Sequence, residues 1–198
     1  VIISTGMNDL KSIKKEIKIL KKNKVKCAIL HTTNLYPTPH NLIRLNALNE
    51  IKKNFPKTVY GLSDHTGENY TSFAAVAMGA SIVEKHFIDK SSRKGPDISA
   101  SVNSNQMRDL LHGVELIHQA KPGGIKPVKE EKKTAEFAFA SVVSNRDIQS
   151  GEILSKRNIW VRRPGTGDFS AEDYPSLIGK KLKKNIKKNT QIKKNHIK

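Results

Sequence analysis

The sequence is short of cysteine, tryptophan and acidic residues, with one Cys and one Trp among 198 residues. Cys27 lies in an apolar run and has no partner for a disulfide within the chain, which is typical of a reducing compartment. There is no apolar run long enough to span a bilayer and no signal-peptide pattern. These absences exclude an internal disulfide framework and disfavour a membrane or secreted protein, so we expect a cytoplasmic protein with no membrane partner.

The low acidic content leaves a formal net charge of +18, from 36 Lys and Arg against 18 Asp and Glu. One interpretation is an anionic partner or substrate, because excess positive charge attracts anions. The other is a compositional bias on solvated surfaces, because most of the excess is Lys and because Asn and Ile are also abundant. The basic runs contain no interleaved aromatic residues, which disfavours a nucleic-acid partner.

Short apolar runs alternate four times with patterns typical of amphipathic helices. The expected strands cover residues 1–5, 27–32, 58–63 and 81–87, and the expected helices cover about residues 10–20, 41–54, 68–78 and 104–120. This alternation predicts βαβ units and a parallel sheet, and therefore an α/β fold. Four units make half of a (β/α)8 barrel, and an open doubly wound sheet is the alternative. No G-x-G-x-x-G turn follows the first strand, so a dinucleotide-binding fold has little support.

The pattern changes after residue 120. Residues 121–134 begin KPGGIKPVKEEKK, which combines Pro, Gly and clustered charge, and they are predicted to form a linker. Residues 135–198 contain β-like runs separated by turn residues and end in a Lys-rich tail. We therefore expect one domain over residues 1–120 and a small mostly-β domain over residues 135–198. Because the chain begins with Val inside a strand-like run, we also expect it to be a piece of a longer protein.

Polar residues follow each predicted strand at its C-terminal end, and in a parallel barrel these ends meet on one face, where active sites form. The third strand ends in GLSDHT (61–66) and the fourth in EKH (84–86). His65 and His86 are neutral imidazoles that could together bind a divalent metal. Strand alternation turns Glu84 to the same side as His86, where it could orient a ligand or a bound water. The competing interpretation is that each histidine is a core residue bonded to backbone.

Ser4, Asn34 and Ser63 are small hydrogen-bonding side chains at three of these strand ends. Together with backbone N–H groups they could hold a phosphate or a carboxylate, although each alone is also common in turns and caps. A phosphate site would also need a cation on the same face. Lys85 is the obvious cation at the four strand ends, but alternation turns it away from its two neighbours.

Two loop residues complete the candidate set. Residues 91–99 form a long predicted loop after the fourth strand, suited to a lid or a substrate clamp. Asp97 in this loop could accept hydrogen bonds from substrate hydroxyls, or it could be a turn residue after Gly-Pro. Arg163 lies in the turn-rich segment RRPGTGDFS, which predicts a fixed projecting loop in the small domain.

Seven motifs in chain order resemble the N-acetylneuraminate synthase family. They are ISTGM, LHTTNLYPTP, GLSDHT, EKHF, GPD, FAFASVV and WVRRPGTGDFS, and together they cover nearly the whole chain. The resemblance implies a partial (β/α)8 TIM barrel, formed by the last four βα units, followed by an antifreeze-protein-like SAF domain. It also implies condensation of phosphoenolpyruvate with N-acetylmannosamine or a related amino sugar and water, giving an N-acetylneuraminate-type sialic acid and phosphate.

The resemblance also implies roles for individual residues. His65 and His86 match the two protein ligands of a manganese or magnesium ion, and Glu84 matches a carboxylate close to that metal. The implied substrate contacts are Ser4, Asn34 and Ser63 for phosphoenolpyruvate, and Tyr36, Asp97 and Arg163 for the amino sugar. The arginine is expected to come from the partner subunit of a domain-swapped homodimer.

The chain departs from the family pattern in one respect, because the four βα units that come before ISTG are missing. Those units carry lysines that grip the phosphate, so we expect this chain to be inactive, or nearly so, by itself. Within the family, a legionaminic acid, pseudaminic acid or spore-coat polysaccharide synthase is the alternative activity. Outside enzymes, the alternative is a non-catalytic module whose lysines bind an anionic glycan.

Overall fold

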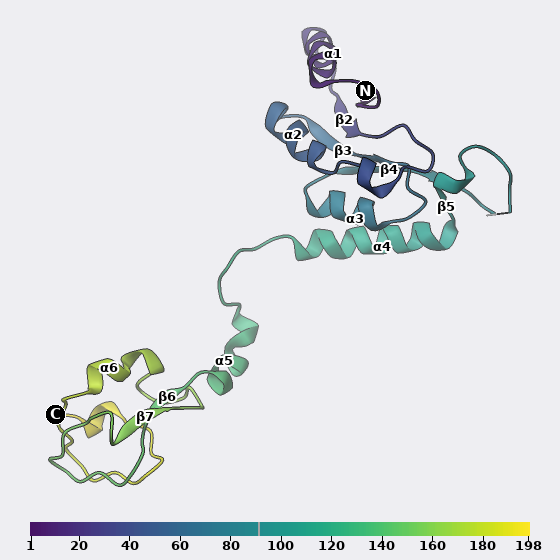
Figure 1. Ribbon diagram of the computed structural model, residues 1–198. Helices are drawn as coiled ribbons and strands as arrows, with labels where there is room; N and C mark the ends of the chain where they lie inside the picture. Colours follow the sequence, from purple (N-terminus) through teal and green to yellow (C-terminus); the bar gives the residue numbers. More distant parts are fainter. Residues whose placement is uncertain (91) are drawn as a thin grey trace. The chain divides into compact units, whose positions relative to one another are not determined.

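The computed structural model describes residues 1–90 and 92–198 and divides into two compact units, Val1–Gly123 and Gly124–Lys198 (Figure 1). Residue 91, at the start of the predicted 91–99 loop, lies outside the described residues. None of the helices in the described part of the chain is both long and apolar enough to cross a membrane.

The first unit is built on a parallel sheet, as the sequence predicts. Its five strands lie in chain order: β1 (Ile2–Ser4), β2 (Ala28–His31), β3 (Val59–Asp64), β4 (Ile82–Phe87) and β5 (Ser101–Val102). The four expected strands are confirmed, and the sheet contains one further strand that the sequence did not predict. The additional strand, β5, has two residues, which is too few for a periodic pattern to reveal it.

Four α-helices follow the strands: α1 (Leu10–Lys22), α2 (Asn46–Asn54), α3 (Tyr70–Ala77) and α4 (Ser104–Ala120). Asp9 caps α1 by accepting from the Ser12 N–H, and Asn103 begins a capping box on α4, which explains why these two helices start close to the expected positions. The expected start of the second helix near residue 41 is wrong. Residues 40–42 form the short 3-10 helix η1 (His40–Leu42) instead. Arg44, at φ 55°, has a left-handed backbone conformation that prevents η1 from continuing into α2.

Helices α1, α2 and α3 pack on one face of the sheet. One buried cluster joins α1, β2 and α2, and consists of Ile13, Ile17, Ile29, Ile51 and Phe55. A second joins α2, β3 and α3, and consists of Leu48, Leu62, Ala75 and Ala80. On the opposite face Ser4 and Glu84 are exposed. The sheet therefore has one apolar face under its helices and a second face that carries polar strand-end residues.

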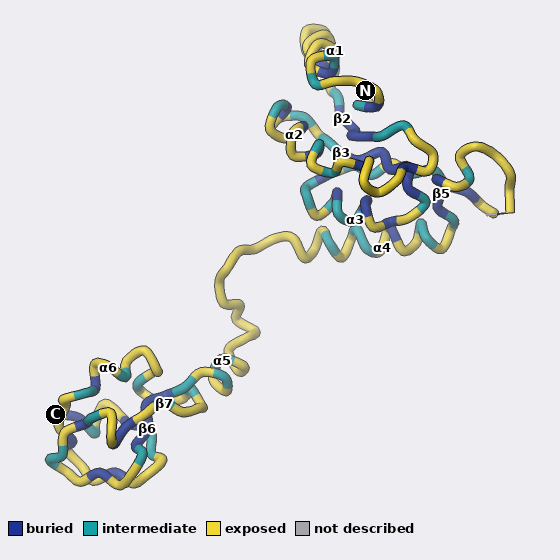
Figure 2. Tube along the Cα trace, in the orientation of Figure 1, coloured by how far each residue is buried: buried dark blue, intermediate teal, exposed yellow. Residues whose placement is uncertain are grey.

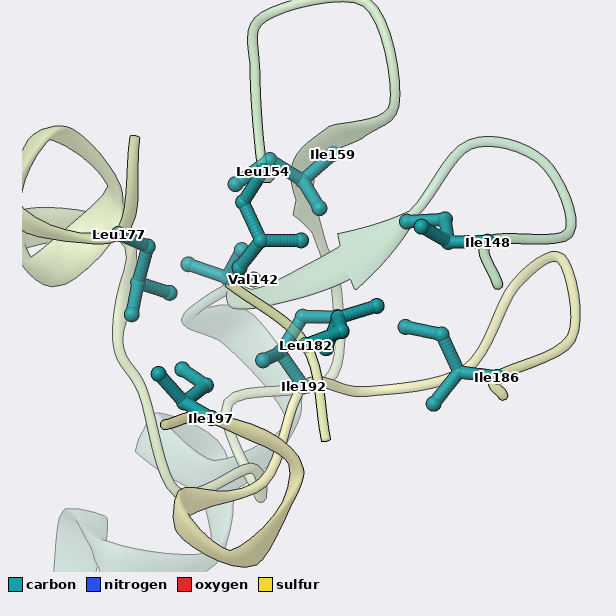
Figure 3. Packing of buried hydrophobic residues seen from close by; sticks show 9 residues of the cluster. All are labelled: Val142, Ile148, Leu154, Ile159, Leu177, Leu182, Ile186, Ile192 and Ile197. Carbon is teal, nitrogen blue, oxygen red and sulfur yellow. The ribbon is translucent and has the colours of Figure 1, made fainter. Parts of the chain in front are cut away.

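The second unit is a small domain with an antiparallel pair of strands, β6 (Ser141–Ser144) and β7 (Ile159–Arg162). Helices α5 (Lys132–Ala138) and α6 (Tyr174–Leu177) and short 3-10 helices η3 (Lys129–Glu131), η4 (Ala171–Asp173) and η5 (Lys194–His196) accompany them. Nine aliphatic side chains form its core (Figure 3): Val142, Ile148, Leu154, Ile159, Leu177, Leu182, Ile186, Ile192 and Ile197.

The segment between the two cores is exposed, as Figure 2 shows. Every residue from 121 to 134 is exposed, which is the range expected to be a linker. Its last residues are helical, because η3 and the start of α5 lie within it. The sequence pattern of Pro, Gly and charge did not reveal these turns of helix.

Candidate functional site

Three rings meet at the C-terminal ends of β2, β3 and β4. The rings of His65 and His86 lie 5.2 Å apart between centroids, with an interplanar angle of 72°. Tyr36 stacks on His65 at 4.3 Å and approaches His86 edge-on at 5.6 Å. The structure therefore brings together the two histidines that the sequence proposed as a pair, and it adds Tyr36 as their shared aromatic neighbour.

Hydrogen bonds define the tautomer of His65. Its Nδ1 lies 3.0 Å from the backbone oxygen of Thr33, and a carbonyl only accepts, so Nδ1 carries the proton. Ser63 Oγ lies 3.4 Å from His65 Nε2, but it donates its single proton to Glu84 Oε1 at 2.6 Å. The lone pair on Nε2 of His65 is therefore available for a ligand.

Glu84 lies directly opposite Ser63 in the pairing of β3 with β4 and is exposed. Its contact with Ser63 places the carboxylate on the same face as that hydroxyl, two residues along the strands from the two imidazoles. One carboxylate oxygen is thus engaged by Ser63, while the side chain still faces solvent. A carboxylate in this position can accept a further hydrogen bond from a water or a substrate hydroxyl.

Ser4 and Asn34 meet around Gly6, at the ends of β1 and β2. The Gly6 N–H donates to Ser4 Oγ at 3.2 Å. A Cβ on Gly6 would lie 2.5 Å from Asn34 Oδ1, so the amide of Asn34 packs directly on the glycine. Ser4 is exposed and Asn34 is partly buried, so both present polar atoms at this end of the sheet.

Asp97 and Arg163 differ in whether the structure places them near the two histidines. Asp97 Oδ2 lies 3.9 Å from His86 Nδ1, and both side chains are partly exposed, so Asp97 belongs to the same neighbourhood as the histidines. Arg163 is exposed in the second unit, just before Pro164. Its role in the site therefore stays a prediction.

A buried ion pair was not recognised in the sequence. Asp64 accepts from Thr71 Oγ1 at 2.6 Å and from Ser72 Oγ at 2.7 Å, and Lys85 Nζ lies 3.2 Å away. Burial raises the pKa of Asp64, but the hydrogen bonds from Ser72 and Thr71 and the charge of Lys85 outweigh it and hold that pKa below its usual range. Lys85 thus points away from the candidate site, as strand alternation predicts.

His31, which received no role from the sequence, is a structural residue. It is buried, its Nε2 donates to the Ile43 carbonyl at 2.6 Å, and its Nδ1 lies 3.2 Å from Thr5 Oγ1. Both ring nitrogens therefore have protein partners. Burial lowers the pKa of this imidazole, which favours its neutral form.

The donor set suits a metal that takes most of its ligands from elsewhere. Among residues 1–90 and 92–198, His, Cys, Asp and Glu form no group of three or more that could hold an ion. A metal about 2.1 Å from one nitrogen of each imidazole lies roughly 3.3 Å from each ring centroid, so centroids 5.2 Å apart can share one ion. Water or substrate oxygens would have to complete its coordination.

The first unit is a parallel α/β sheet with two neighbouring imidazoles at its carboxyl ends, and the second is a small β domain, so the molecule falls in the class of α/β proteins that carry a small β domain. Residues 1–126 match the NeuB family and residues 139–198 match the SAF domain. The chain belongs to the NeuB family and carries a SAF domain.

Several of the relatives are sugar-acid synthases. The chain is 38% identical to the N,N'-diacetyllegionaminic acid synthase of Campylobacter jejuni over 98% of its own length and 58% of that protein. It is 30% identical to the N-acetylneuraminate-9-phosphate synthase of Homo sapiens over 92% of its length and 51% of that protein. The chain thus spans a little over half the length of these relatives.

A solved structure gives the same picture. The N-acetylneuraminic acid (sialic acid) synthetase of Leptospira borgpetersenii, in complex with citrate, superposes with a TM-score of 0.63 and 28% identity. The match covers 69% of this chain and 48% of that one.

Proposed function

We propose that this chain is the half of a nonulosonic acid synthase that binds the metal and contributes to both substrate sites. The reaction joins the methylene carbon of phosphoenolpyruvate to the aldehyde carbon of an N-acetylated amino sugar. Water adds to the adjacent carbon, and phosphate leaves with cleavage of its C–O bond. The observation that carries this proposal is the facing pair of His65 and His86 with a free Nε2 lone pair on His65.

The metal would be held by His65 and His86 and would be Mn²⁺ or Mg²⁺. When bound, it supplies Lewis acidity toward the sugar aldehyde. Because only two protein side chains would bind the ion, its other coordination positions would be open to water or to the carbonyl oxygen of the substrate.

The polar strand ends hold the phosphoenolpyruvate. Ser4 presents its hydroxyl and Asn34 its amide at one end of the sheet, whereas Ser63, two strands away, gives its proton to Glu84 and holds that carboxylate in place. Donors in fixed positions hold the enol carbon of phosphoenolpyruvate in line with the sugar aldehyde. This orientation lowers the entropic part of the activation free energy for joining the two substrates. Glu84, with one oxygen engaged by Ser63, accepts a proton from the water that adds to the enolpyruvate carbon.

The amino sugar lies against the exposed side of the three rings. Tyr36, 44% exposed, offers its ring and hydroxyl to the sugar, and Asp97, close to His86, accepts from sugar hydroxyls. Arg163 of a second copy reaches the N-acetyl group in a domain-swapped homodimer. The 38% identity to the Campylobacter jejuni relative makes N,N'-diacetyllegionaminic acid a candidate product beside N-acetylneuraminate.

The chain alone is an incomplete synthase in this proposal. It spans 58% of the Campylobacter jejuni relative, and its sheet has five strands where a closed barrel has eight. The cations that would neutralise the phosphate are expected in the missing units, because Lys85 is engaged on the other face by Asp64. A second segment must therefore close the sheet before turnover is possible.

The test measures phosphate release from phosphoenolpyruvate with a panel of N-acetylated amino sugars and Mn²⁺. The chain is assayed alone and after mixing with the N-terminal segment of the Campylobacter jejuni relative that precedes the matched region. We expect release in the mixture and a loss of release when the chain carries H65A. Turnover by the chain alone at ordinary enzyme rates would refute the proposal that it is an incomplete synthase. If the mixture showed neither Mn²⁺ binding nor turnover, the proposed function itself would be refuted.

A further inference from the structure

We propose that the buried pair Asp64–Lys85 positions the rings of His65 and His86 next to each other. This inference rests on the proposed function, because it concerns the same two imidazoles. Asp64 and Lys85 act through the backbone of β3 and β4 and do not contact the reacting groups. They are therefore positioning residues rather than catalytic ones.

The pairing of the strands explains how a contact on one face controls the other. Asp64 and Lys85 are directly opposite each other in the parallel register of β3 and β4. Asp64 precedes His65 in the chain, and Lys85 precedes His86. Because a slip of one residue turns every side chain to the opposite face, the ion pair holds the register that keeps both imidazoles on one side.

Asp64 also fixes the backbone of His65. Its Oδ1 accepts from the Thr66 N–H at 2.9 Å, which closes a turn with His65 in the middle. The backbone oxygen of His65 accepts from the Thr38 N–H at 3.0 Å, and its ring donates to the Thr33 carbonyl at 3.0 Å. The peptide group that joins His65 to Thr66 is therefore held at both its N–H and its carbonyl, and the ring of His65 is held as well.

Lys85 joins the strand that carries His86 to the segment that follows His65. Its Nζ donates to the backbone oxygen of Glu68 at 2.6 Å and lies 3.2 Å from Asp64 Oδ2. The side chains of Asp64 and Lys85 are each 1% exposed, whereas every other ion pair found in residues 1–90 and 92–198 has partners at least one third exposed. Removing one partner would leave a buried charge without a partner and out of reach of water. We therefore expect the ends of β3 and β4 to move when the ion pair is lost.

The variants are chosen to separate positioning from folding. K85M removes the ammonium, K85R keeps a positive charge, and D64N/K85Q removes both charges without leaving one unpaired in the interior. D147N is the matched control, because it breaks the exposed Asp147–Lys187 pair in the second unit. Far-UV circular dichroism and urea unfolding establish which variants fold, and only those are compared.

Two measurements are made on the folded proteins. The first is the set of nuclear Overhauser effects between the ring protons of His65 and His86 in the metal-free chain. The second is the Mn²⁺ affinity by electron paramagnetic resonance. We expect the wild type, K85R and D147N to share the ring contacts and the affinity. K85M and D64N/K85Q should lose the contacts and bind Mn²⁺ about 10- to 100-fold more weakly, as for loss of an outer-shell partner.

The outcomes separate this inference from the proposed function. Folded K85M and D64N/K85Q with wild-type ring contacts would overturn the positioning role, whatever the metal affinity. Ring contacts that are present in the wild type and lost in both variants, with no Mn²⁺ binding by any protein, would support the positioning role and count against the metal function.

Discussion

At the scale of single residues, one lone pair decides what the candidate site can bind. Ser63 has one hydroxyl proton and donates it to Glu84, and His65 donates its Nδ1 proton to Thr33. Among residues 1–90 and 92–198, the hydroxyl near Nε2 of His65 is that of Ser63, at 3.4 Å, and its proton goes to Glu84, so this nitrogen keeps its lone pair. His31 shows the contrast, because both its ring nitrogens have partners within the chain. A histidine that serves only the core resembles His31, so the free nitrogen of His65 is the feature that favours metal binding.

Removal of either imidazole is predicted to abolish most of the Mn²⁺ binding by this chain. H65A and H86A should each weaken binding by more than the roughly 10- to 100-fold that loss of an outer-shell partner costs, because each removes a direct ligand. H112A, at an exposed position on α4, is the control and should bind like the wild type. Isothermal titration calorimetry with Mn²⁺ measures all three. Equal affinity in H65A and H112A would contradict the assignment.

Protonation of His31 is predicted to destabilise the first unit in mild acid. Burial lowers the pKa of His31 below 6.5, against the hydrogen bond to Ile43 and with help from the charge of Arg44. Below pH 6.5 the unfolded chain therefore binds more protons at this site than the folded chain, and stability falls as the pH falls.

H31Q provides the matched comparison, since an amide can still donate to the Ile43 carbonyl but does not titrate. Urea unfolding of the first unit at about pH 7.5 and about pH 5.5 should show a smaller loss of stability in H31Q than in the wild type. The same loss in both proteins would show that other groups cause the acid sensitivity.

At the scale of the elements, strands β3 and β4 carry the site on one face and the ion pair on the other. The sequence predicted both strands, the side on which His86 lies and the direction of Lys85, because these follow from a period of two. It missed Asp64, whose burial depends on Thr71 and Ser72 in the following helix. A sequence pattern within one strand does not reveal a contact between the end of that strand and the next helix. The ion pair could therefore be recognised only in the three-dimensional structure.

The close pairing of β3 and β4 predicts a large effect of a single methyl group. A Cβ on Gly61 would lie 2.1 Å from the backbone oxygen of Ile82 and 2.8 Å from Leu30 Cδ2. Because a backbone atom cannot rotate away, G61A should destabilise the first unit by about 1–3 kcal/mol or more. G124A is the control, since a Cβ there meets nothing within 4 Å. Urea unfolding measures both, and equal stabilities would contradict the close approach of the strands.

At the scale of the whole molecule, lysine is spread over both units. The helix α1 alone carries Lys11, Lys14, Lys15, Lys18, Lys21 and Lys22, and the last nineteen residues of the chain, 180–198, are also Lys-rich. The polar strand ends around His65 and His86 are not part of either run. The distribution favours solvated surfaces over one dedicated anion site, although the total charge still attracts anions in general.

The second unit is predicted to unfold as a separate body, because it has a core of its own. Leu154 is 0% exposed in that core, whereas its neighbour Ile153 is 60% exposed. L154A should destabilise the second unit by about 2–5 kcal/mol through lost burial and a cavity, and I153A should change it by less than about 0.5 kcal/mol. Neither substitution should alter Mn²⁺ binding at His65 and His86. Two urea transitions, of which L154A shifts one, are the expected result, and a single transition shifted as a whole by L154A would show instead that the two cores unfold together.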